Sequence, residues 1–339
     1  PRPMKKKDLD RVLAKVHSRP DGALRMIASY SLPGRFVGPF RYEGTRSDDP
    51  NDLVPHEKRR DLRALHVLCA WLNHTDAKAG NSGDTLVEEN GIRFIKHYLM
   101  DFGAILGSDS DMRKNARFGN EYVIPSGHDA LKDIFTFGFR SPAWQRASYP
   151  RQKAIGRFEA NVFDPESWKA NYPNPAHLSR QPDDDYWAAK QVMAFTDDDI
   201  RAIVETGRYS DPQVVDYIAR TLSRRRDKIG RTYFSKVFAL DNFRVVDGTL
   251  QFDDLEVKHN FIGSRKYDVR WSSFDNASNN RAPLKGEVSF RVPGKATGSA
   301  AGEYYCALIT EAGRPSKRIV VYVRKNGSGT DVVGIDRTF

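Results

Sequence analysis

The stretches NHTDAKAGN (Asn73–Asn81) and MDFG (Met100–Gly103) determine how this sequence is interpreted. The first follows a segment, 56–72, that is predicted to be a helix. Apolar residues such as Leu65 and Cys69 recur in it at helical spacing, so the helix is expected to be substantially buried. The second ends a strand-like segment of alternating residues. Rigid elements would therefore hold both polar stretches in place.

The polar residues of these stretches are the types that phosphoryl transfer requires. One carboxylate must orient or deprotonate the acceptor hydroxyl, a second must hold magnesium, and an amide oxygen can complete the metal shell. We assign these roles to Asp76, Asp101 and Asn81, respectively. Lys78 is predicted to contact the transferring phosphate.

The two stretches resemble the catalytic motifs of the protein-kinase-like superfamily. H-x-D-x-K-x-x-N is matched by His74, Asp76, Lys78 and Asn81, and D-F-G by Asp101–Gly103. The resemblance implies a phosphotransferase that uses ATP and Mg²⁺, with Asp76 and Lys78 catalytic and with Asn81 and Asp101 binding the metal and its nucleotide. It is closer to divergent bacterial or secretory-pathway kinases than to ordinary eukaryotic protein kinases, and to bacterial proteins that join a kinase-like part to a sandwich tail.

The order of elements expected for such a fold also fits. A helix, two extended segments, a linker and a long helix are predicted at 5–16, 23–32, 36–42, 47–52 and 56–72. Three departures stand out. The gap between Asn81 and Asp101 is long and predicts a loop insertion, no A-P-E follows Gly103, and the phosphate-covering glycine loop and strand lysine are missing. We expect these upper strands to lie upstream of Pro1, to come from another chain, or to be lost.

The sequence predicts an α+β protein, in which a mainly helical kinase-like lobe is followed by an antiparallel β-sandwich. Residues 1–45 are assigned to a partial N-lobe and hinge, and 46–233 to the kinase-like C-lobe. Residues 234–339 read as short strands separated by Gly, Asn and Pro turns, which is typical of an immunoglobulin-like or fibronectin-III-like sandwich. Trp271 is predicted to anchor the core of this sandwich.

Composition limits the alternatives. The formal net charge of +10 comes from 54 Lys+Arg against 44 Asp+Glu, but it is spread along the chain, so nucleic-acid binding is the least favoured function. No apolar run reaches the roughly 18 residues of a membrane span. Cys69 and Cys306 are assigned to different domains, so no disulfide is predicted, and no Cys/His set has zinc-ligand spacing. The sandwich tail favours a periplasmic or secreted location.

A non-enzymatic function stays open beside the kinase interpretation. A kinase-like lobe without its nucleotide lid would act as a scaffold, docking to a protein partner in a larger assembly through the aromatic-rich segment 104–182 and the sandwich. If the chain is an enzyme, its acceptor can be protein, sugar or lipid.

Two further sites have competing interpretations. Asp84 is either a third metal-site carboxylate or a solvated loop acid, and the second is predicted. His56, Arg59 and Arg60 either bind an anion or simply begin a polar helix, and again the second is predicted.

Overall fold

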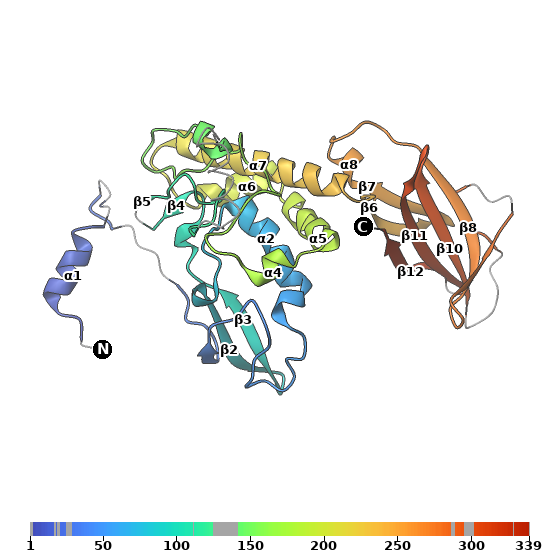
Figure 1. Ribbon diagram of the computed structural model, residues 1–339, viewed down its shortest axis with the longest axis horizontal. Helices are drawn as coiled ribbons and strands as arrows, with labels where there is room; N and C mark the ends of the chain where they lie inside the picture. Colours follow the sequence, from blue (N-terminus) through green and yellow to red (C-terminus); the bar gives the residue numbers. More distant parts are fainter. Residues whose placement is uncertain are drawn as a thin grey trace. The chain divides into compact units, whose positions relative to one another are not determined.

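The computed structural model describes residues 3–16, 18, 21–24, 29–110, 112–124, 142–285, 289–294, 302–327 and 329–338 (Figure 1). The chain forms two compact units. Unit 1 comprises Pro1–Phe40 and Gly83–Tyr98, and unit 2 comprises Arg41–Ser82 and Leu99–Phe339. Helices and antiparallel sheets are both present, which confirms the α+β class.

Unit 1 is built on a three-stranded sheet of order β1-β2-β3. Its elements are α1 (Lys6–Leu13), β1 (Arg35–Gly38), β2 (Ser82–Glu89, which begins in unit 2) and β3 (Ile92–Leu99, which ends there). Strand β3 lies in the segment that was predicted to be strand-like, whereas β2 occupies the part of the gap that was predicted to be a loop insertion. The loop prediction is therefore wrong at β2. Strand β2 begins with the small and polar residues SGDT, which show no alternation of apolar and polar positions, so the sequence did not indicate a strand there. At the predicted strand 23–32, residues 25–28 lie outside the described residues.

Gly34 permits the sheet to close against the segment before β1. Its φ is +83°, and a Cβ there would lie 2.3 Å from the carbonyl oxygen of Leu86 in β2. Only glycine accepts both this backbone conformation and this close approach.

Three helices of unit 2 pack around one apolar core. α2 (Arg60–Leu72), α5 (Pro182–Met193) and α7 (Pro212–Ser235) supply most of its buried side chains. The remaining elements of the helical part are η1 (His56–Lys58), η2 (Ala79–Asn81), η3 (Phe102–Ala104), β4 (Ser108–Asp109), β5 (Met112–Arg113), η4 (Ala143–Arg146), α4 (Pro175–Leu178) and α6 (Asp197–Glu205). The predicted helix 56–72 is interrupted at Arg59, whose extended backbone separates η1 from α2. Among the described residues, no helix is long and apolar enough to cross a membrane.

The C-terminal part of unit 2 contains a five-stranded antiparallel sheet of order β12-β11-β10-β8-β9 and a two-stranded sheet, β6-β7 (Figure 1). The elements are β6 (Leu240–Val246), β7 (Thr249–Asp254), α8 (Leu255–Lys258), β8 (Tyr267–Asp275), β9 (Asn280–Pro283), β10 (Glu303–Glu311), β11 (Arg314–Asn326) and β12 (Gly329–Arg337). Leu240 and Leu250 share a core with Ile309 and Val321 of the large sheet. Trp271 is 1% exposed in this core, as predicted.

Asp241 joins the helical part of unit 2 to the sheets. Lys190 of α5 lies 2.6 Å from one of its carboxylate oxygens, and Arg337 of β12 lies 3.0 Å from the other. The change from helices to strands falls between the end of α7 at Ser235 and the start of β6 at Leu240, just after the predicted position of 234. The assignment of domains stays a prediction.

Candidate functional site

Helix α2 is followed by a turn of fixed direction. Asn73 adopts a left-handed conformation, with φ of 53°, and the N–H of His74 donates to the carbonyl of Cys69 at 2.8 Å. The Asn73 side chain accepts a hydrogen bond from the indole of Trp168 at 2.9 Å. A Cβ on Gly119 would lie 2.3 Å from the same amide oxygen, so only glycine fits there.

A buried arginine from α7 caps the last turn of α2. Arg225 donates to the carbonyls of Ala70 at 2.5 Å and Trp71 at 2.9 Å, and to that of Glu159 at 2.8 Å. Its guanidinium also lies 3.5 Å from the centroid of the Phe163 ring. Burial lowers the pKa of Arg225 to about 9, against the opposing charge of Glu159. A cation at a helix C-terminus satisfies carbonyls that the helix leaves unpaired.

The loop that follows brings three predicted residues together. The amide nitrogen of Asn81 donates to the Asp76 carboxylate at 2.8 Å and to the Asp76 carbonyl at 2.9 Å. Lys78 Nζ lies 3.0 Å from the other carboxylate oxygen of Asp76. The N–H of Met100 donates to the carbonyl of Asn81 at 2.8 Å, which joins this loop to the residue before Asp101.

Asp101 lies in an exposed turn. Its φ is 56°, and within the described part of the chain its carboxylate accepts one hydrogen bond, a local one from the N–H of Gly103 at 3.1 Å. The ring of Phe102 is half exposed, with its centroid 5.6 Å from that of His74. Burial lowers the pKa of His74, while the charges of Asp76 and Asp101 both act to raise it.

Lys114 is a residue of this site that the sequence analysis missed. It is 2% exposed, and its Nζ donates to Thr75 Oγ1 and to the carbonyl of Ala104, each at 2.6 Å. Burial lowers its pKa to about 8, against the charges of Asp109 and Asp76. Lys114 thus connects the Asp76 loop to the residue after Gly103. It lies among polar residues, MRKNAR, so periodicity gave no sign of its burial.

A cavity of about 330 Å³ lies beside Asp76. The loop forms one wall, and Tyr42, Tyr172 and Asn174 contribute to the others. The N–H of Asn171 donates to the carbonyl of Thr75 at 2.7 Å, which holds the two walls together. A small acceptor molecule could approach the carboxylate here.

The structure gives different outcomes for the two sites that had competing interpretations. Asp84 is fully buried in β2, with its carboxylate 2.6 Å from His97 Nδ1, so the prediction of a solvated acid is wrong. His56 and Arg59 both bind Asp52, at 2.7 and 2.5 Å. These two side chains hold a carboxylate of the preceding turn, which agrees with a structural helix start.

Asn81 and Asp101 carry oxygen atoms of the kind that magnesium prefers as ligands. Asn81 uses its amide nitrogen for Asp76, which leaves its oxygen for a cation, and only one Asp101 oxygen has the local bond to Gly103. Within the described ranges, no group of three or more His, Cys, Asp and Glu side chains could hold a metal. Magnesium commonly binds through one or two protein oxygen ligands together with substrate phosphates.

No protein-family model, curated protein or solved structure matches this chain.

Proposed function

We propose that this chain is a phosphotransferase of a divergent kinase-like family, which uses ATP and Mg²⁺. The hydrogen-bonded pair of Asp76 and Asn81 carries the proposal, because it unites the acceptor-orienting carboxylate and the metal-binding amide in one held loop. The bond from Met100 to Asn81 adds support, since it holds the chain close to this loop just before Asp101.

Each side chain would contribute a distinct step. Asp76 would orient the acceptor hydroxyl and take its proton, and Asn81 and Asp101 would hold Mg²⁺. Lys78 would move from its ion pair with Asp76 to the phosphate, because its side chain is half exposed and free to turn. Bound magnesium would neutralise charge on the nucleotide phosphates. The cavity beside Asp76 would receive the acceptor.

A scaffold function has one observation in its favour. Among the described residues of 1–40, the regular elements are α1 and the four-residue β1, so a glycine-rich hairpin with a strand lysine is not found among them. A nucleotide would then have few groups to contact among these residues. In this alternative the chain docks to a protein partner without catalysis.

Calorimetric titration with ATP and Mg²⁺ separates the two functions. The enzyme interpretation expects binding in the wild type, loss of at least tenfold in affinity in Asp101→Asn, and no binding when EDTA replaces Mg²⁺. Asp76→Asn is the matched control, since it should bind ATP as the wild type does. Equal binding by the wild type and Asp101→Asn, or no binding by either, would contradict the assigned metal site.

A further inference from the structure

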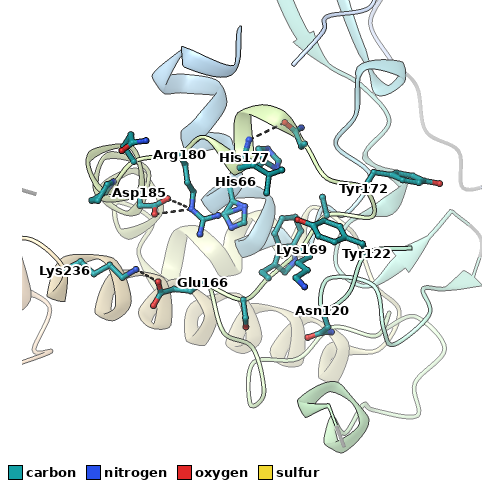
Figure 2. Close-up of a pocket in the computed structure, with 17 residues that line it drawn as sticks. His66, Asn120, Tyr122, Glu166, Lys169, Tyr172, His177, Arg180, Asp185 and Lys236 are labelled. Carbon is teal, nitrogen blue, oxygen red and sulfur yellow. Dashed lines mark hydrogen bonds and ion pairs between the residues drawn. The ribbon is translucent and has the colours of Figure 1, made fainter. Parts of the chain in front are cut away.

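A second and larger cavity, of about 560 Å³, shares two lining residues, Tyr172 and Asn174, with the Asp76 cavity. α2, the segment 166–172, α4 and the start of α5 line it (Figure 2). Its size is within the range of small-molecule binding sites. None of the predicted catalytic residues lines it.

Two histidines in its wall have unused hydrogen-bonding groups. His66 and His177 are 4% and 5% exposed, with ring centroids 5.4 Å apart, and Figure 2 shows them side by side. Nε2 of His66 and both ring nitrogens of His177 have no hydrogen-bond partner in the described structure. Leaving a buried polar group unpaired costs about 1–3 kcal/mol, so such atoms in a cavity wall indicate a missing partner.

Both histidines are uncharged at neutral pH. Burial, aided by the nearby charge of Arg180, lowers the pKa of His66 to about 2 and that of His177 to about 3. A neutral imidazole offers one N–H donor and one nitrogen acceptor. The partner must therefore both accept and donate hydrogen bonds.

The charged groups of the same wall are already paired. Arg180 Nε lies 3.1 Å from a carboxylate oxygen of Asp185, and Lys236 pairs with Glu166, as the dashed lines in Figure 2 mark. The Lys169 ammonium lies over the ring of Tyr122, 5.1 Å from its centroid. Two carboxylates of the wall thus already neutralise two of its cations, which favours a neutral ligand over a charged one.

From these observations we infer that the cavity binds a neutral polyhydroxylated ring, such as a monosaccharide or a cyclitol. Hydroxyl groups supply a donor and an acceptor in one atom, which is what the two imidazoles lack. The C–H faces of such a ring would pack on the aromatic side chains of the wall, Tyr122, Trp168 and Tyr172.

The ligand would lie next to the Asp76 loop without touching it. Tyr172 and Asn174 line both cavities, and the Asn174 amide donates to the carbonyl of Ala77 at 3.4 Å. Occupancy is independent of the proposed phosphotransfer, since binding requires neither ATP nor magnesium. A failure of one proposal therefore leaves the other standing.

The test measures binding of D-glucose, D-galactose, D-mannose, myo-inositol and maltose to the whole chain by saturation-transfer NMR and calorimetry, without nucleotide. Glucose 6-phosphate and glutamate are the charged comparators. We expect at least one neutral probe to bind with a Kd in the millimolar range or below. His66→Phe, which keeps a ring of similar shape, should raise that Kd at least tenfold.

His259→Phe is the matched control, because His259 lies outside the cavity wall and should leave the Kd unchanged. Tyr172→Ala is a second test variant, since the side chain is 45% exposed and its removal spares the fold; it should weaken binding at least threefold. Binding of no neutral probe, equal binding by the wild type and His66→Phe, or binding of the charged probes alone would overturn the inference.

Discussion

The two halves of the candidate site are held very differently. The Asp76 loop is fixed by buried groups from three separate segments, including Arg225 behind α2, Lys114 at Thr75 and the N–H of Asn171. The Asp101 turn is exposed, and its carboxylate has one bond, to the N–H two residues along. The Asp76 loop is therefore preorganised before any ligand binds, whereas the Asp101 turn is not.

This difference indicates that the free energy of metal and nucleotide binding would be used to order the Asp101 turn and not the Asp76 loop. A loop held by buried hydrogen bonds can keep a catalytic carboxylate in position at no cost during the reaction. A turn with a free oxygen can adjust to a metal ion and its phosphates, and contacts to the ion would then order it.

Removing the Asp76 carboxylate should have the largest effect. In Asp76→Asn we expect magnesium-dependent ATP hydrolysis, with water as acceptor, to fall about 10²–10⁴-fold, the usual contribution of a general base. Its affinity for ATP should stay within twofold, because Asp76 is not assigned to the metal. Hydrolysis rates with a thermal-melting control measure this, and an unchanged rate would remove Asp76 from the chemistry.

Arg225→Met should cost about 3–5 kcal/mol in the free energy of unfolding, since it leaves several buried carbonyls without their donor. The control is Arg224→Met on the same helix. Arg224 is exposed and donates to the side chain of Asn161 at 2.8 Å, so its loss should cost less than about 1 kcal/mol. Urea titration of both variants gives the comparison. Similar losses would mean that the cap of α2 is not what holds the loop.

The sequence was sufficient to predict which residues form the Asp76 loop, but not which residues hold that loop in place. Asp76, Lys78 and Asn81 are adjacent in sequence, so a local turn brings them together and spacing was sufficient. Lys114 reaches the loop from 39 residues away, and Arg225 reaches the last turn of α2 from 154 residues away. Nothing in their surroundings distinguishes them from solvated basic residues, because burial of a cation depends on which carbonyls the fold leaves unpaired.

The same reasoning explains the errors at β2. Asp84 and His97 pair across the hairpin at 2.6 Å, so a buried acid found its partner on the neighbouring strand. Alternation indicated β3, whereas β2 has buried polar residues at successive positions and no apolar period. Trp271 was easier to predict, since a large aromatic side chain in an alternating segment has few places to go other than the core.

Lys114→Met should cost about 1–3 kcal/mol at pH 7, because Thr75 Oγ1 and the Ala104 carbonyl lose their donor. Lys153→Met, at an exposed position, is the control and should change the free energy of unfolding by less than about 0.5 kcal/mol.

The same lysine gives a pH signature. Its pKa is lowered from the ordinary 10.5 to about 8, so between these values the unfolded chain holds a proton that the folded chain has released. Stability should therefore rise with pH across this window, by up to about 1.4 kcal/mol per pH unit. The rise should be smaller in Lys114→Met, because the contribution of this group is lost while those of other buried bases such as Arg225 remain. Chemical denaturation at pH 7.5, 8.5 and 9.5 measures it, and equal slopes in the two proteins would contradict the buried position of this ammonium.

Asp101→Asn should have the smallest effect on stability, below about 0.5 kcal/mol. Asparagine tolerates the left-handed backbone and can accept the same bond from the N–H of Gly103 through its side-chain oxygen. Thermal melting of this variant beside Arg225→Met compares the two halves directly. A loss of 2 kcal/mol or more in Asp101→Asn would mean that the turn is as firmly held as the loop. Little change in melting, combined with a large loss of magnesium-dependent ATP binding, would instead identify Asp101 as a residue kept for its ligand, since it contributes almost nothing to the fold.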